Sequence, residues 1–508
     1  MEYANSYKGI ATGDLNRFIG KFWEFQLQQN RWAPLQVSVS ENVIFGGRSE
    51  AILWDSGNGE LFDFVTEKLG EGKTGAWIRG KEAWGRQGIA VSQMSSLSTS
   101  LYSGDLFDEN TAAIVPKDDA HLPAIFAFCR SNEFRSEVKK IDGSSLKIPN
   151  LTMLKVPFEI DRWQAIAAED FKECLPSAAS EDATQWLFSG HPGHTDKGLV
   201  VGICRLAGFS WPRQLNCVIN GCHPIGNDDL EKHGDADGIV CLTALKGEPP
   251  AEQRLNALLA DAFGADWSAS KLASLLAQMG YAGKSLDDWL RDGFFAQHCE
   301  LFEQRPFIWH IWDGRRDGFH ALVNYHRLAA PNGEGRRTLE KLIYSYLGDW
   351  IDRQRADQKV SVEGADARLA HAEHLKTELI KILEGEAPYD IFVRWKPLHE
   401  QPMGWDPDIN DGVRMNIRPF MTARPLGARS ITTCILRATP KIKWDKDRGK
   451  EPTRDKTDYP WFWGWEEITP NFVGGTEFDG NRWNDLHYSR AVKQTARDRH
   501  RASMGGKI

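Results

Sequence analysis

The 508-residue sequence is long enough for about two to four domains, and 41% hydrophobic residues suffice for packed cores. A formal net charge of -8 excludes a protein that binds polyanions over its whole surface, so any nucleic-acid interface must be local. No apolar run is as long as a membrane span, the first residues lack a signal-peptide pattern, and the 8 cysteines are scattered; we therefore expect a cytoplasmic protein without a membrane partner.

Residues 1–160 alternate short apolar runs with glycine-rich turns. Strands are expected in "AILWDSGNGELFDFV", "GAWIRG", "GIAVSQM" and "TAAIVPK". In "LPAIFAFCRSNEFRSEVKKI", residues 122–141, the apolar side chains recur at helical spacing and predict one helix. This part of the chain is expected to form an α/β domain.

Residues 161–300 are expected to be mostly helical. In "SASKLASLLAQMG", Ser268 is a suitable N-cap and Gly280 a suitable stop. The stretch "SLDDWLRDGFFAQHCELF" follows the same pattern. This region is interpreted as a helical linker domain.

Residues 301–508 begin with a predicted hairpin, "RPFIWHIWDGRRDGFHALVNYH", whose turn holds two aspartates and two glycines. Two amphipathic helices follow, "RRTLEKLIYSYLGDWIDRQ" and "DARLAHAEHLKTELIKILEG", and then an irregular, basic and Trp-rich end. The predicted fold class is therefore α+β, mixed and multi-domain, with an α/β domain, a mostly helical region and an α+β C-terminal domain.

One glycine pattern imitates a nucleotide site. "LGEGKTG" has glycines at 70, 72 and 75, as in a dinucleotide fingerprint, but a helix-like run precedes it and the strand-like "AWIRG" follows. The fingerprint requires the opposite order, so that the phosphate meets a helix N-terminus. A P-loop would also need a glycine at position 67, where Glu67 stands. We expect no nucleotide site here.

Metal sites receive little support from spacing. A zinc module has closely spaced ligand pairs at both ends, and only the first pair of the set Cys217, Cys222, His223, His233 and Cys241 comes close. Three histidines of the predicted hairpin, His310, His320 and His326, are able to converge in a suitable strand register. Composition and spacing alone identify no active site and no metal site.

Several long segments resemble a known family. "GIATGDLNRFIGKFWE", residues 9–24, resembles the segment that follows the catalytic domain in bacterial adenine-specific DNA methyltransferases of the type IIG kind, including the PglX proteins of BREX and the methylases of DISARM. "SSLKIPNLTMLKVPFEID" is similar to the close of their target-recognition region. The predicted hairpin with "LEKLIYSYLGDWIDRQ", and the stretch from "YDIFVRWKPLHEQPMGW" through "RMNIRPFMTA" to "PKIKWDKDRGK", resemble their downstream and C-terminal parts.

The sequence also departs from that family. Leu15 stands where the opening turn of the family, T-G-D-N, has asparagine. More importantly, the chain has neither the N-P-P-[YFW] tetrad that holds a flipped adenine nor a glycine-rich turn suited to S-adenosylmethionine. The resemblance therefore implies the DNA-recognition portion of an S-adenosylmethionine-dependent enzyme of a restriction–modification or phage-defence system. Such a chain is not expected to methylate DNA alone. It is either a split subunit, whose partner is a separate methyltransferase catalytic chain, or a truncated gene product.

Double-stranded DNA is the other partner that the resemblance implies. Target-recognition regions read base edges with Arg, Lys, Asn and Gln and hold phosphates with further cations. The residues expected to contact DNA are Asn16, Arg17, Arg79, Lys81, Arg86, Lys147, Asn150, Arg315 and Arg316.

Two other hypotheses stay open. Asp118 or Asp119 with Glu137 and Lys139 would suit a metal-dependent nuclease, although Glu137 and Lys139 fall in a predicted helix rather than on a strand. Alternatively, the chain is an interaction module that docks other proteins of a defence complex and never contacts DNA.

Overall fold

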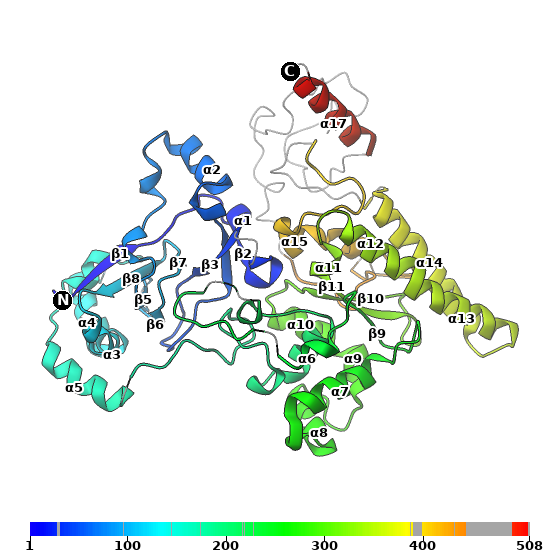
Figure 1. Ribbon diagram of the computed structural model, residues 1–508, viewed down its shortest axis with the longest axis horizontal. Coiled ribbons are helices and arrows are strands. Elements are labelled where there is room, and N and C mark those ends of the chain that lie inside the picture. Colours follow the sequence, from blue (N-terminus) through cyan, green and yellow to red (C-terminus); the bar gives the residue numbers. More distant parts are fainter. Residues whose placement is uncertain are drawn as a thin grey trace. The chain divides into compact units, whose positions relative to one another are not determined.

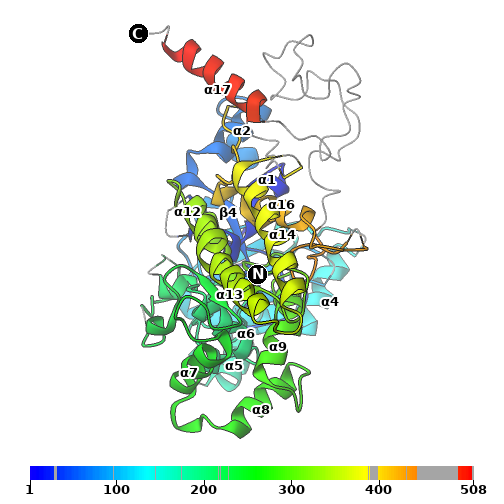
Figure 2. The same cartoon turned by 90° about the vertical axis from the view of Figure 1, so that its right-hand side faces the viewer.

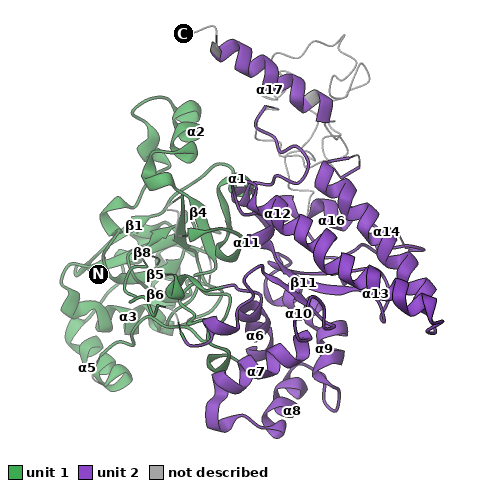
Figure 3. Ribbon diagram, turned by 45° about the vertical axis from the view of Figure 1, so that its right-hand side comes forward, with its two compact units in different colours: residues 1–195, 210–228 green, residues 196–209, 229–508 purple. Residues whose placement is uncertain are grey.

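The computed structural model describes residues 1–27, 31–94, 96–143, 145–172, 174–215, 217, 219–226, 228–386, 388–389, 399–430, 432–442 and 490–505. The chain separates into two compact units, residues 1–195 with 210–228 and residues 196–209 with 229–508 (Figure 3). Helices accompany small sheets in both units, so the predicted α+β class is confirmed. The division into three domains stays a prediction. The tryptophans of the basic C-terminal stretch, Trp444 to Trp465, lie outside the described residues.

The first unit contains two sheets, and its elements run from blue to cyan in Figure 1. Its strands are β1 (Ala4–Lys8), β2 (Ile19–Lys21), β3 (Trp32–Gln36), β4 (Glu50–Leu53), β5 (Gly88–Ser92), β6 (Thr99–Tyr102), β7 (Leu106–Phe107) and β8 (Thr111–Pro116). Its α-helices are α1 (Leu15–Phe18), α2 (Glu60–Leu69), α3 (Leu122–Arg130), α4 (Asn132–Ile141) and α5 (Ile160–Phe171).

One sheet of this unit, in the order β1-β8-β5-β6, is antiparallel throughout. Strands β5 and β8 are buried along their whole length, because their apolar side chains alternate between two cores. Ile89 and Ile114 pack into a core that includes α3, α4 and α5. On the opposite face Ala90 and Val115 pack with Phe107. The strands predicted at "GIAVSQM" and "TAAIVPK" are confirmed.

Helices α3 and α5 pack against each other beside this sheet (Figure 1), with the rings of Phe128 and Trp163 5.1 Å apart. The single helix predicted over residues 122–141 is wrong, because Ser131 between α3 and α4 has an extended backbone. Its hydroxyl accepts a 3.1 Å hydrogen bond from the backbone N–H of Phe134 and caps α4. A serine that suits either a helix surface or an N-cap leaves this choice open in the sequence.

The other sheet of this unit has the order β2-β4-β3-β7, and β3 and β7 run parallel. Helix α2 follows β4 and leads into the glycine-rich turn. The strand predicted over "AWIRG" is wrong, because the backbone N–H groups of Trp77 and Ile78 both donate to the Thr74 carbonyl, at 3.0 and 2.8 Å. These bonds close a tight turn after the 3-10 helix Thr74–Ala76 instead of extending the chain.

The second unit is mainly helical. Its α-helices are α6 (Gly198–Leu206), α7 (Ala251–Phe263), α8 (Ala269–Gln278), α9 (Leu286–Asp292), α10 (Phe294–Leu301), α11 (Tyr325–Leu328), α12 (Glu334–Glu340), α13 (Leu347–Lys359), α14 (Ala365–Glu384), α15 (Gly412–Asn416), α16 (Arg418–Thr422) and α17 (Arg490–Gly505). Its strands are β9 (Ile239–Cys241), β10 (Ile308–Trp312) and β11 (His320–Asn324). Ser268 caps α8 through the backbone N–H of Lys271, as the sequence predicts.

The predicted hairpin is confirmed as the antiparallel pair β10 and β11, and β9 pairs with the other edge of β11. Further along the chain, a π-helical turn (Lys341–Tyr346) joins α12 to α13. Helices α13 and α14 lie side by side, connected by residues 360–364 (Figure 2). Within the described ranges, no helix combines the length and apolar character that crossing a membrane requires.

Candidate nucleic-acid interface

The turn between β7 and β8 in the first unit is held by side chains. The Asp108 carboxylate accepts hydrogen bonds from the Asn110 backbone at 3.2 Å and from the Thr111 hydroxyl at 2.6 Å. The buried amide of Gln93 donates to the carbonyl oxygens of Glu109 and Thr111, at 3.3 and 3.2 Å. Glu109 and Asn110 therefore project from a fixed backbone.

Three cations surround Glu109. The Arg79 guanidinium and the Lys147 ammonium lie 3.9 and 4.0 Å from the same Glu109 oxygen, Oε2. Lys147 also donates a 2.8 Å hydrogen bond to Asn110 Oδ1. Burial lowers the pKa of Lys8, the nearby charges of Arg79 and Lys147 lower it further, and Glu109 raises it. We call Lys8, Arg79, Glu109, Asn110 and Lys147 the Glu109 cluster.

The Glu109 cluster carries more positive than negative charge, because its three cations outnumber Glu109 and the neighbouring Asp108 carboxylate, which also interacts with Lys147. Its two ion pairs are long and partly exposed, with 45% of the Glu109 side chain accessible. Exposed pairs of this kind contribute about 0–1 kcal/mol, so an anion of higher charge density competes with Glu109 for the cations. Such a cluster suits a phosphate group.

Arg79 and Lys147 are the two sequence-predicted residues that the fold brings together around one carboxylate. Asn150, the first residue of the 3-10 helix Asn150–Leu154, contacts the strand that ends at Lys8. Its amide donates to the Ser6 carbonyl of β1 at 2.9 Å. Two further predicted residues lie in the same unit. Lys81 is exposed and has no ion pair within the described part of the chain, and Arg86 donates to the Pro116 carbonyl at 2.8 Å.

The residues of the opening turn make contacts within the first unit. Arg17 forms an ion pair with Glu60 at 3.3 Å, and its guanidinium lies 4.8 Å from the Phe18 ring centre. Asn16 is exposed on the short helix α1. Arg17 therefore links α1 to α2 in this structure.

The other two predicted residues lie in the second unit, on the turn between β10 and β11. The Asp313 carboxylate accepts from the backbone N–H groups of Arg315 and Phe319, each at 2.9 Å, and so shapes this turn. Arg315 pairs with Asp317 at 2.9 Å. Arg316 is 68% exposed but lies 3.3 Å from one carboxylate of α9 and 3.1 Å from another. Both arginines are thus matched by acidic partners.

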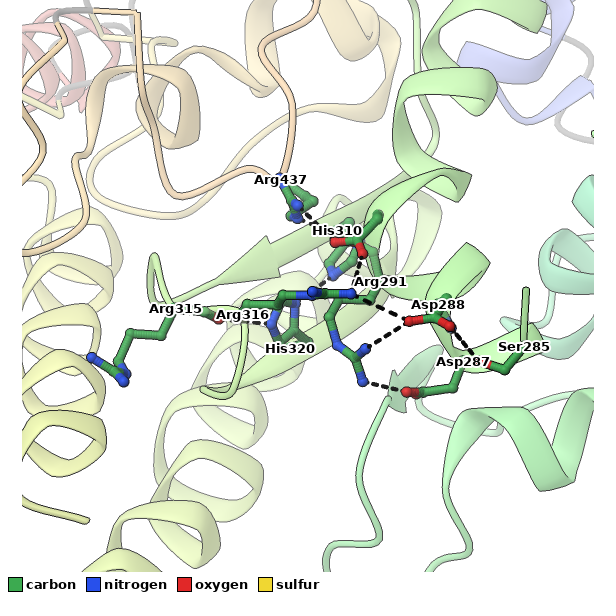
Figure 4. A network of polar contacts seen from close by, with 10 residues as sticks. Ser285, Asp287, Asp288, Arg291, His310, Arg315, Arg316, His320 and Arg437 are labelled. Atoms are coloured by element: carbon green, nitrogen blue, oxygen red, sulfur yellow. Dashed lines mark hydrogen bonds and ion pairs between the residues drawn. The ribbon is translucent and has the colours of Figure 1, made fainter. Parts of the chain in front are cut away.

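Figure 4 shows the side chains around this turn. Arg291 and Arg437 approach the α9 carboxylates from other directions, and the Arg437 guanidinium lies 2.9 Å from Asp292. The arginines and aspartates balance each other, so this network favours a structural role within the second unit. It offers less free positive charge to DNA than the Glu109 cluster.

Two of the three hairpin histidines converge beneath this network. His310 Nε2 and His320 Nδ1 are 3.0 Å apart, and His320 Nε2 lies 2.9 Å from the Arg315 carbonyl oxygen. Because a carbonyl only accepts, His320 Nε2 carries the proton, and His310 Nε2–H then donates to His320 Nδ1. Burial lowers the pKa of both, to about 4 for His320 and well below the ordinary value for His310. His326 packs instead against the rings of Phe209 and Phe307.

Two residues of the nuclease hypothesis, Asp118 and Glu137, make other contacts. Asp118 accepts a hydrogen bond from the Ala120 backbone at 3.0 Å, and Glu137 forms an ion pair with Lys140. In the described ranges, no three His, Cys, Asp or Glu side chains gather in a way that could hold a metal ion.

Sequence reasoning missed three members of the Glu109 cluster. Lys8 ends a strand, and Glu109 with Asn110 lies in the turn "DEN". The only signal was the turn-forming composition of that stretch, which indicates a loop but not its neighbours. Neither the family-model scan nor the search of curated proteins finds a match to this sequence.

Proposed function

We propose that this chain is the DNA-recognition portion of an adenine-specific DNA methyltransferase of a restriction–modification or phage-defence system. The Glu109 cluster is the observation that carries the proposal. The resemblance of residues 9–24 and 144–161 to the borders of a target-recognition region supports it, since both segments belong to the unit that holds the cluster.

In this proposal the cluster holds the DNA backbone. Lys8, Arg79 and Lys147 approach a phosphate from three segments of the chain, and Asn110 is a neutral hydrogen-bonding group beside them. Phosphate contacts of this kind set the register of a protein on the duplex and make the affinity depend on salt. Lys81, which is exposed in the same unit, is a further candidate for a DNA contact.

The complete enzyme would require S-adenosylmethionine, and the described residues do not fit that cofactor. The glycine-rich turn follows helix α2 and leads into the 3-10 helix Thr74–Ala76, so no strand precedes it. A Cβ atom added at Gly70, Gly72 or Gly75 would meet no atom within 4 Å, so no close backbone approach requires these glycines. We therefore assign no cofactor role to this chain.

The test is fluorescence anisotropy of the full chain with a labelled duplex of mixed sequence, over a series of salt concentrations. Lys147→Ala is expected to weaken binding and to reduce the slope of log K against log salt by about 0.9, the loss of one phosphate contact. Lys232→Ala, which removes an exposed cation of the second unit, is the matched control and is expected to change neither. Absence of binding at the lowest salt would reject DNA recognition and favour an interaction module.

The same protein and duplex also test the nuclease hypothesis. Cleavage of the duplex that requires Mg²⁺ and is lost in Glu137→Ala would support it. We expect no such cleavage, because the Glu137 carboxylate is paired with Lys140 on the surface of α4.

A further inference from the structure

The first unit exposes several large apolar side chains, and one of them, Leu146, directly precedes Lys147 of the Glu109 cluster. Among its described residues, the exposed large hydrophobic side chains are Leu15, Met94, Ile141, Leu146, Leu151 and Ile225. Four of these six lie at position 94 or between 141 and 151. Leu146 is the most exposed, at 86%. Single exposed leucines are common, so the exposure of Leu146 gains meaning from the cations of the Glu109 cluster next to it in the chain.

Two of these residues, Leu146 and Met94, lie next to Lys147 along the backbone. Lys147, which directly follows Leu146, forms an antiparallel β-bridge with Met94. The next residue, Ile148, is buried and donates a 2.7 Å hydrogen bond to the Gln93 carbonyl. Leu146 and Met94 are therefore both neighbours of Lys147 along the backbone, and Lys147 reaches Asn110 of the cluster.

The combination of charge and apolar surface selects among possible partners. Protein–protein interfaces usually have an apolar centre from which charged residues are depleted. Here Lys147 directly follows the exposed Leu146 and is bridged to Met94, and it shares Glu109 with Arg79. Proteins that deform DNA combine these two features, since cations hold the phosphates while a leucine or methionine enters between two base steps.

We propose that Leu146 inserts between adjacent base pairs of the duplex held by the Glu109 cluster and unstacks them. This step presupposes the DNA binding proposed above. A local opening of the stack would assist an adenine methyltransferase, because the target base has to leave the duplex before it is methylated. The inserted side chain acts as a positioning residue and contacts DNA bases without taking part in chemistry.

The experiment uses closed-circular plasmid DNA, which offers many sites and needs no knowledge of the recognised sequence. The plasmid is relaxed by topoisomerase I with the full chain bound, and the protein is then removed. Side-chain insertion unwinds the duplex, so the purified plasmid is expected to be negatively supercoiled, with a shift that grows with bound protein. Binding is measured in parallel by anisotropy, and shifts are compared at equal occupancy.

Leu146→Ala is expected to lose at least half of this shift while the salt slope of binding stays unchanged, and Leu146→Phe is expected to retain it. Leu146 is mostly exposed, so neither variant threatens folding. Val360→Ala, at a 72% exposed apolar position of the second unit, is the matched control. DNA binding with no shift, or an equal shift with Leu146→Ala, would overturn insertion but leave DNA recognition standing. Absence of plasmid binding at low salt would overturn both.

Discussion

Lys147 donates a hydrogen bond of 2.8 Å to Asn110, a residue 37 positions earlier in the chain. This bond joins the segment after α4 to the turn between β7 and β8, and it places a cation beside Glu109. Neither segment is a binding site by itself. Their proximity depends on β5, whose end contacts both through the backbone of Gln93.

Replacing Glu109 with glutamine tests whether this carboxylate restrains the cations around it. Glu109→Gln removes the one negative charge of the cluster, so we expect affinity for mixed-sequence duplex to rise about two- to fivefold at low salt, the effect of about 0.5–1 kcal/mol. The difference is expected to shrink at high salt, where exposed charges are screened. Anisotropy titrations at two salt concentrations measure it. Glu363→Gln, at an exposed position of the second unit, is the control, and equal affinities of Glu109→Gln and wild type would contradict the prediction.

Asp105 gives the first unit a pH dependence of its own. Burial raises the pKa of this carboxyl to about 6, although the nearby Arg48 charge lowers it in part. A pKa raised by folding stabilises the protein fully below the unfolded pKa, near 4, and this contribution is lost as the pH rises through about 6. Asp105→Asn is therefore expected to be more stable than wild type above about pH 6, by about 1–3 kcal/mol, and to lose this advantage toward pH 4.

Hydrogen exchange of the β5 and β8 amides, compared between variant and wild type at each pH, reports on this unit alone. Asp119→Asn removes an exposed carboxyl of the same unit and is expected to show no such pH dependence. A stability difference that is the same at pH 5 and pH 7.5 would count against the role of Asp105.

The buried histidines act in the opposite direction on the second unit. Burial lowers the pKa of His320 to about 4, below its unfolded value near 6.5. The neutral, buried His320 therefore stabilises the folded protein above about pH 6.5, and this contribution is lost as the pH falls through about 4. The loss amounts to about 3 kcal/mol of the free energy of unfolding for this one group. His320→Gln is expected to flatten the pH dependence of exchange at the β10 and β11 amides. Asp313, whose pKa burial raises to about 6, opposes this trend and is present in both proteins, so the comparison isolates His320.

The glycine of the opening turn is expected to tolerate no side chain. Gly13 has φ of +71°, and a Cβ there would lie 2.3 Å from the Trp77 ring. Gly72 has a similar φ, +74°, but no atom within 4 Å of its Cβ position, so it is the matched control. Gly72→Ala is expected to cost about 1–2 kcal/mol of local strain, and Gly13→Ala more, because the ring has to move as well. Hydrogen exchange at residues 11–18 and 74–80 measures both, and equal protection in the two variants would contradict the expected clash.

Much of the fold could be predicted because its signals are local. Three predicted features depend only on neighbours within a few residues, and the structure confirms all of them. They are the strand that begins at Ile308, the turn with Asp313 and Gly314, and the helix cap at Ser268. The prediction of a single helix over residues 122–141 failed because the local pattern there fits two structures. Ser131 ends one helix and caps the next, although the apolar spacing around it suits a single helix.

The candidate site shows more clearly what the sequence leaves undetermined. The sequence alone marked Arg79 and Lys147 as cations able to contact DNA, and it determined that the chain has no N-P-P-[YFW] tetrad. Only the tertiary structure decided that these two cations share Glu109, that Lys8 joins them, and that Arg315 and Arg316 are matched by carboxylates. The reason is physical: a charge acts on whatever lies within a few ångströms, and that distance is set by strand pairing and core packing among residues far apart in the chain.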